Sequence, residues 1–182
     1  MDVAGLVLGI IGTVLAAASV GWNVAQYLLS GARPKLTPII GANYGAGAFR
    51  VDATKDARPT LLALEAQLEA NAQDRILGVT VVNRGRADLR VTGWEFRVRP
   101  AGARHFPAAV PGSPAIPCTI PPGGEETFFT SAATVCPATA AVQAAAGRSQ
   151  RLVAMITSGG CSYESKPIAR ENFGTWLDGG PQ

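Results

Sequence analysis

Residues 75–99, which read RILGVTVVN, RGRA and DLRVTGWEFRVR in order, carry the strongest strand signals of the chain. The first run is rich in β-branched residues. In the last run Trp94, Phe96 and Val98 alternate with charged residues, which is typical of a strand buried on one face. A turn at 84–86 separates the two runs. The stretch therefore predicts a β-hairpin with an aromatic core face.

Further short strands are expected on both sides of this hairpin. They cover residues 35–41, 115–120, 125–130, 151–157 and 161–166, and a turn at 158–160 joins the last two. Short helices are expected at 59–74, 137–146 and 171–177. The prolines of residues 100–124 predict a long loop, where a partner would bind first. The pattern favours a mainly β fold, namely an immunoglobulin-like β-sandwich with one or two short accessory helices.

The N-terminal segment has no charged side chain between Asp2 and Arg33. About 20 apolar residues match the hydrocarbon core of a bilayer, so we expect a transmembrane helix. The predicted organisation is a transmembrane helix at 1–30, a junction at 31–36, a β-sandwich at 37–170 and a tail at 171–182 that can form a short helix. Two alternatives are a cleaved signal peptide and an apolar helix buried by other subunits of a large assembly.

The flanking charges predict the orientation of this helix. Asp2 is the only charged side chain before it, whereas Arg33 and Lys35 follow it closely. Basic residues are retained on the cytoplasmic side of membranes. We therefore expect a single-pass protein of the cell membrane whose folded domain is cytoplasmic.

Small residues recur every fourth position along one face of the predicted helix. They are Gly5, Gly9, Thr13, Ala17, Gly21 and Ala25. Such a face lets two helix backbones approach closely, which predicts self-association or pairing with another membrane protein. The alternative is that Gly and Ala are simply common in membrane helices.

The charge of the chain is mildly basic, with a formal net charge of +3, and this is too weak a signal to predict nucleic-acid binding. Arginines nevertheless gather around the predicted hairpin: Arg84, Arg86, Arg90, Arg97, Arg99 and Arg104, diluted by Asp88 and Glu95. A domain tethered to a bilayer could turn these arginines toward anionic lipid headgroups. The alternative is a solvated strand face.

Residues suited to catalysis or metal binding are sparse. Cys118, Cys136 and Cys161 form no C-x-x-C pair, and a Cys118–Cys136 disulfide stays open for an oxidising compartment. The single histidine, His105, falls in the Pro-rich loop, and residues 158–162 do not complete a G-x-S-x-G motif. We expect no catalytic residues, no metal site and no cofactor.

Several motifs occur in a characteristic order along the chain. After the uncharged helix come SGARP at 30–34, VTVVNRGR at 79–86, VTGWEF at 91–96, PPGGEE at 121–126 and YESKP at 163–167. This order resembles small uncharacterised membrane-anchored proteins of actinobacteria and their phages. The resemblance covers most of the chain, apart from apparent insertions at 52–74 and 100–115. It implies one N-terminal transmembrane helix, an immunoglobulin-like domain and no catalytic residues.

Two functions follow as expectations from these observations. The first is a non-enzymatic, single-pass membrane-anchored interaction module that presents a β-sandwich near the membrane surface. The second is a structural subunit of a larger particle or envelope complex, in which partner subunits bury the apolar helix. The sequence identifies no protein partner for either function, because its strand and turn motifs indicate the fold and not what the fold binds.

Overall fold

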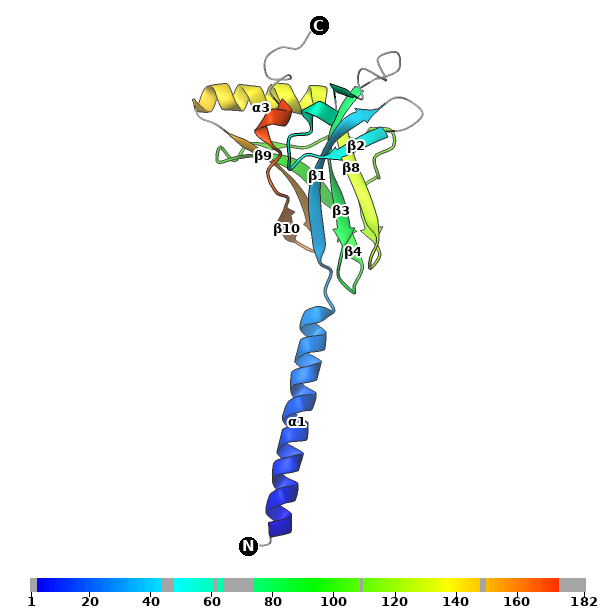
Figure 1. Ribbon diagram of the computed structural model, residues 1–182, viewed down its shortest axis with the longest axis vertical. Helices are drawn as coiled ribbons and strands as arrows, with labels where there is room; N and C mark the ends of the chain where they lie inside the picture. The colour runs from blue at the N-terminus through cyan, green and yellow to red at the C-terminus, as the bar shows by residue number, and fades with distance from the viewer. Residues whose placement is uncertain are drawn as a thin grey trace.

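The computed structural model consists of an N-terminal helix that stands away from a folded β-domain (Figure 1). It describes residues 3–43, 48–60, 62–63, 74–108, 110–147 and 150–173. In these ranges the domain has ten strands, and every strand pair is antiparallel. The expected mainly β class with one N-terminal apolar helix is confirmed.

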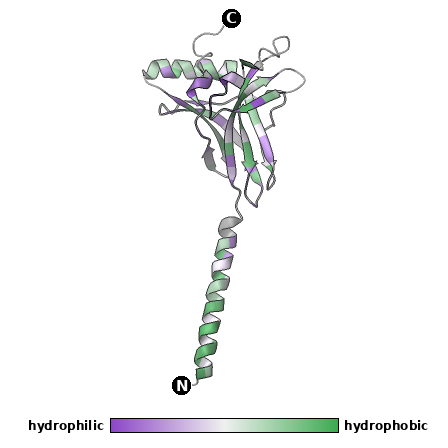
Figure 2. Cartoon of the chain, in the orientation of Figure 1, coloured by the Kyte–Doolittle hydropathy of each residue, from purple (hydrophilic) through white to green (hydrophobic). Residues whose placement is uncertain are grey.

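Helix α1 (Val3–Leu29) has 27 residues, which corresponds to a length of about 40 Å. Residues 3–26 are long and apolar enough to cross a membrane, and no part of this segment is buried by the rest of the chain. Figure 2 shows the apolar residues continuing along most of the helix. The domain therefore folds without using α1 in its core.

The first sheet has the strand order β2-β1-β3-β8. Its strands are β1 (Pro34–Asn43), β2 (Ala48–Asp52), β3 (Asp74–Asn83) and β8 (Glu125–Ser131). β1 and β3 pair along their whole length, with Pro34 opposite Asn83 and Asn43 opposite Asp74. The β-branched residues of β3 suit this central position, because a central strand packs on both faces.

The second sheet has the order β10-β9-β5-β6. Its strands are β5 (Gly93–Arg99), β6 (Arg104–His105), β9 (Arg151–Ser158) and β10 (Cys161–Glu164), while β4 (Leu89–Val91) and β7 (Cys118–Ile120) form a separate pair. The predicted hairpin around 158–160 is confirmed as β9–β10. Gly159 and Gly160 both have positive φ angles, of 56° and 78°, as a two-residue hairpin turn of type I′ requires.

Both four-stranded sheets contribute to one hydrophobic core. Leu77 of β3 and Phe128 of β8 are fully buried, as are Phe96 of β5 and Ile156 of β9. The ring of Trp94 lies 5.4 Å from that of Phe96, edge to face, and 6.2 Å from that of Phe128. The predicted aromatic core face of this segment is confirmed, and its rings connect the two sheets.

The predicted pairing of residues 75–83 with 88–99 is wrong, because the two runs belong to different sheets. β3 pairs with β1 and β8, whereas β5 pairs with β6 and β9. The second run is also divided at Thr92, whose amide and hydroxyl both donate to the carbonyl oxygen of Thr157. The turn at 84–86 leads the chain from the first sheet to the second instead of reversing it along β3.

Helix α3 (Ala132–Ala146) begins before the predicted start at 137. The hydroxyl of Ser131 accepts a hydrogen bond from the amide of Ala133 and caps the helix, and Pro137 lies inside it. The predicted range of 137–146 rested on the Ala-rich composition of these residues, and the helix includes five residues before it. In Figure 1, α3 lies across the end of the domain opposite α1.

Two other predicted helices fall largely outside the described residues. Of the helix expected at 59–74, residues 59–60 and 62–63 are described and helical, as is residue 58 before them. The predicted end at 74 is wrong, because Asp74 is the first residue of β3. Of the turn expected at 171–177, the structure describes the 3-10 helix η1 (Arg170–Phe173). The buried Asn172 fixes η1 by donating to the carbonyl oxygens of Ala53 and Lys55.

The Pro-rich residues 100–124 are more ordered than a simple loop. They contain β6, which was not predicted, and β7, the short strand found within the one expected at 115–120. The hydroxyl of Ser113 accepts a hydrogen bond of 3.2 Å from the amide of Phe129 in β8. Because β8 is at the edge of its sheet, this contact satisfies a backbone donor that has no strand partner.

Candidate membrane-proximal site

The loop after β3 contacts the segment that joins α1 to the domain. The amide of Arg84 donates to the carbonyl oxygen of Arg33 at 2.9 Å, and the amide of Arg86 donates to that of Gly31 at 3.3 Å. Gly85 lies so close to residues 31–33 that any side chain there would overlap their backbone. The loop is thus held against the base of the helix.

Asn83, which is fully buried, connects this contact to the domain. Its side-chain oxygen accepts hydrogen bonds from the amides of Gly85, at 3.0 Å, and Arg33, at 3.4 Å. Its side-chain nitrogen donates to the carbonyl oxygens of Ala87, at 2.8 Å, and Ile120, at 3.0 Å. One side chain therefore joins β3, β7 and the helix junction.

The structure divides the arginines of the predicted lipid-facing surface between two regions. Arg84 and Arg86 are exposed in the loop beside the junction, and Arg90 is exposed on β4. Arg97 and Arg99 lie on β5, on the sheet face that points away from the core. The five residues therefore do not form one continuous basic face.

The β5 arginines also differ from the loop arginines in their partners. Arg97 pairs with Glu95 at 3.1 Å, and Arg99 pairs with Glu164 of β10 at 2.7 Å. Within the described part of the chain, no carboxylate pairs with the side chain of Arg84 or Arg86. The loop arginines beside α1 thus differ from the β5 arginines, whose charges are paired with carboxylates.

A buried carboxylate on β5 organises a second feature that the sequence analysis did not identify. Glu95 is only 5% exposed, and it accepts hydrogen bonds from Arg104 at 2.6 and 2.8 Å. This carboxylate raises the pKa of the Arg104 guanidinium, mainly through the side-chain hydrogen bond. Arg104 in turn lies 5.0 Å from the ring centre of Phe106, whose side chain is 67% exposed.

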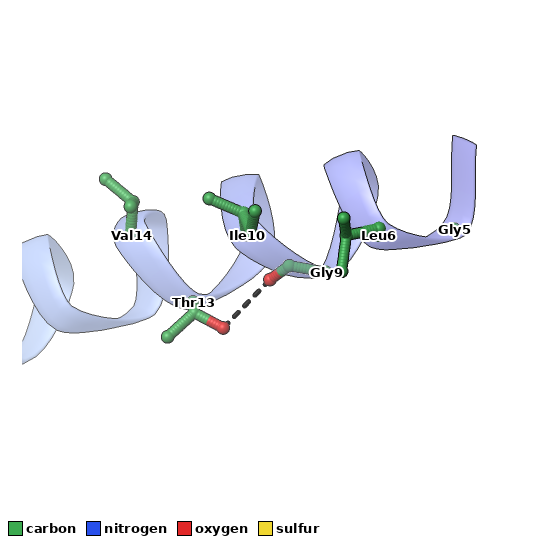
Figure 3. A pocket seen from close by; sticks show the side chains of 6 residues that line it. All are labelled: Gly5, Leu6, Gly9, Ile10, Thr13 and Val14. Atoms are coloured by element: carbon green, nitrogen blue, oxygen red, sulfur yellow. Dashed lines mark hydrogen bonds between the residues drawn. The ribbon is translucent and has the colours of Figure 1, made fainter. Parts of the chain in front are cut away.

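The predicted helix-pairing face forms a shallow groove near the N-terminal end of α1 (Figure 3). Gly5, Gly9 and Thr13 line it, together with the neighbouring row of Leu6, Ile10 and Val14. The hydroxyl of Thr13 donates to the carbonyl oxygen of Gly9 at 2.8 Å. The Thr13 hydroxyl therefore has its hydrogen-bond partner within α1 itself. Ala17, Gly21 and Ala25 continue the face along α1.

The three cysteines are free, so the Cys118–Cys136 disulfide left open by the sequence is not formed. Cys118 is half-buried on β7, Cys136 is buried in α3, and Cys161 is exposed on β10. Burial raises the pKa of the Cys136 thiol to about 12, although Arg75 opposes the shift. Burial also raises the pKa of Cys118, and the charge of Glu126 adds to the effect.

The residues considered for catalysis lie apart from one another. His105 is half-buried on β6, opposite Phe96, and residues 158–162 form the β9–β10 turn and the start of β10. No group of three or more His, Cys, Asp or Glu that could hold a metal ion occurs among the residues described. No protein-family model matches the chain, and no similar protein was found among the curated proteins or solved structures compared with it.

Proposed function

We propose that this chain is a non-enzymatic, single-pass membrane-anchored interaction module. The observation that carries the proposal is the contrast between α1, which the rest of the chain leaves uncovered, and a β-domain that completes its core without it. An exposed apolar helix of this length is stable in a bilayer, where its backbone hydrogen bonds are satisfied internally. In this proposal the helix holds the protein at the membrane, and the domain presents a binding surface to a protein partner.

We propose further that the domain is cytoplasmic. By the positive-inside rule, this orientation is favoured by Arg33 and Lys35, which follow the span closely in sequence. The fold adds Arg84 and Arg86, because their loop is hydrogen-bonded to residues 31–33. The folded domain therefore brings more positive charge to this end of α1 than the flanking sequence alone.

An immunoglobulin-like topology is also proposed. If β1, β3, β5, β8, β9 and β10 are strands A, B, C, E, F and G, the sheets have the orders A-B-E and C-F-G, as in immunoglobulin domains. Trp94 on β5 then occupies the strand of the core tryptophan in that fold. β2 beside strand A and α3 between strands E and F are additions to the pattern.

The surface proposed to meet a protein partner is the start of the Pro-rich segment around Phe106. Exposed aromatic residues and arginines dominate the binding energy of many interfaces. Phe106 is held by Arg104, and Arg104 is held by the buried Glu95. This order of contacts limits the motion of the exposed ring, which lowers the entropy lost on binding.

A structural subunit of a larger assembly is the second candidate function. The groove lined by Gly5, Gly9 and Thr13 favours it, since a neighbouring helix could approach the backbone there.

Membrane extraction separates the two functions. A retained membrane span predicts a full-length chain that stays with membranes after alkaline carbonate treatment. A chain that sediments with a particle after lipid removal supports the assembly subunit instead, and an intact mass without residues 1–30 identifies a cleaved signal peptide.

The orientation can be tested with the native thiols. A membrane-impermeant maleimide should label the exposed Cys161 only after permeabilisation of the cells. Labelling of intact cells would contradict the cytoplasmic orientation. The Cys161→Ser variant is the control and should lose the rapid signal in both conditions, because Cys136 is buried and Cys118 half-buried.

The interaction surface can be tested by site-specific photocrosslinking in cells. A photoreactive residue at position 106 should give one discrete adduct, and the same residue at Thr119, which is exposed on β7, serves as the control. Glu95→Gln should weaken the adduct at 106, because it loosens Arg104. Identical adducts from both positions would show random collision and contradict the proposed surface.

A further inference from the structure

We infer that the junction collar, defined as Arg33, Lys35, Arg84 and Arg86, binds the phosphate groups of anionic phospholipids. The inference rests on the proposed function, because the collar reaches headgroups only if α1 spans a membrane. The candidate span ends at Gln26, and the collar begins seven residues later. This short separation keeps the collar within or next to the headgroup layer.

Backbone contacts fix the position of the collar. Arg84 and Arg86 are exposed, while Gly85 between them is buried against residues 31–33. The hydrogen bonds to Arg33 and Gly31 hold both arginines beside the base of the helix. The backbone of both arginines is already held in place, so it does not have to rearrange when a lipid phosphate binds. Little backbone conformational entropy is therefore lost on binding.

Charge complementarity selects the ligand. Arg99, on the outward sheet face, is paired with Glu164, whereas Arg84 and Arg86 have no carboxylate partner in the described part of the chain. Guanidinium groups bind phosphate through paired hydrogen bonds. A basic residue near an anionic leaflet contributes about 1 kcal/mol, which corresponds to about fivefold in lipid association for each arginine.

The experiment uses the full chain in phosphatidylcholine nanodiscs. Trace amounts of spin-labelled phosphatidylglycerol or phosphatidylcholine are added, and electron paramagnetic resonance measures how strongly each lipid associates with the protein. The chain should prefer phosphatidylglycerol. The double variant Arg84→Gln/Arg86→Gln should lose most of this preference, with a reduction of up to about fivefold per arginine at low salt.

Two matched variants separate the site from general charge. Arg84→Lys/Arg86→Lys keeps the charge but loses the paired hydrogen bonds, so it should retain more of the preference than the glutamine variant and less than the wild type. Arg99→Gln/Arg151→Gln removes the same charge from two residues that face each other on β5 and β9, and it should have no effect. If Arg99→Gln/Arg151→Gln loses the same amount of phosphatidylglycerol preference, the preference comes from net charge and the proposed site is overturned. An unchanged preference in Arg84→Gln/Arg86→Gln would also overturn the site.

Two further outcomes complete the test. Equal association of both lipids with the wild-type chain overturns the inference but leaves the membrane anchor supported, since immobilised lipid is still present. Absence of any immobilised lipid contradicts the anchor itself. Glycerol phosphate in solution should not displace the labelled lipid, and displacement would overturn lipid binding in favour of a site for free phosphate.

Discussion

The backbone amide of Arg84 donates a hydrogen bond of 2.9 Å to the carbonyl oxygen of Arg33, although the two residues are far apart in sequence. The contact joins the loop after β3 to the start of β1, close to the end of α1. The four residues 30–33 connect α1 to β1, and the loop contacts three of them, residues 31–33. The contact therefore fixes residues 31–33 of the connection against the domain.

Gly85→Ala should release the loop from the junction. The added Cβ would overlap the carbonyl oxygen of Gly31 and the amide nitrogen of Arg33. We expect a destabilisation of about 1–3 kcal/mol and faster hydrogen exchange at residues 84 and 86. Gly93→Ala is the control, because its Cβ would make an ordinary contact with Thr157 at 3.9 Å. Similar exchange in both variants would contradict this role of Gly85.

Asn83→Ala should be among the most destabilising changes in the domain. It removes the two donated and two accepted side-chain hydrogen bonds and leaves buried backbone groups without partners. The expected loss is about 2–4 kcal/mol in the free energy of unfolding, measured by denaturant titration in detergent. Asp88→Ala, an exposed change in the same loop, should stay within about 0.5 kcal/mol. Equal effects would argue against the connecting role of Asn83.

Glu95→Gln should cost much more stability than Glu164→Gln. The Glu95 side chain is 7% exposed between Arg97 and Arg104, whereas the Arg99–Glu164 pair has side chains 45% and 36% exposed. We expect a loss of about 1–3 kcal/mol for Glu95→Gln and at most about 1 kcal/mol for Glu164→Gln. Chemical denaturation of both variants measures the difference, and an inverted order would refute the buried network.

Cys136 should make the stability of the domain sensitive to high pH. Burial raises the pKa of its thiol from 9.0 to about 12, so the unfolded chain ionises at lower pH than the folded chain. The contribution is complete below pH 9 and is lost between pH 9 and about 12, with an upper limit of about 4 kcal/mol. Unfolding curves of wild type and Cys136→Ala should converge over this range. Cys161→Ser is the control and should follow the wild-type curve.

Local sequence pattern was sufficient to predict most strands of this domain. The alternation around Trp94 located β5, and Gly159-Gly160 located the β9–β10 turn, because both signals come from neighbouring residues. Which strands pair was not predictable in the same way. β3 is paired on both sides, with β1 and β8, so it has no free edge for β5. These pairings join residues far apart in sequence, and no short-range pattern contains them.

The residues of the candidate site were only partly predictable for the same reason. Arg84 and Arg97 look alike in sequence, and Glu95 alone decides that one is paired and the other is not. Asn83 has the composition of an ordinary turn residue, although it is fully buried. The start of α3 was missed because the prediction rested on the Ala-rich composition of 137–146, while the helix is capped earlier by Ser131.

The contact between Ser113 and Phe129 has a consequence for chains confined to one membrane. Molecules restricted to a surface meet their neighbours far more often than molecules free in solution, so any unprotected sheet edge becomes a risk for uncontrolled polymerisation. The Pro-rich segment contacts the β8 edge at Phe129, and the other edge of that sheet is the five-residue β2. The edges of the second sheet are β10, with four residues, and β6, with two. If α1 anchors the chain in a bilayer as proposed, these short or covered edges limit strand-to-strand pairing between neighbouring domains.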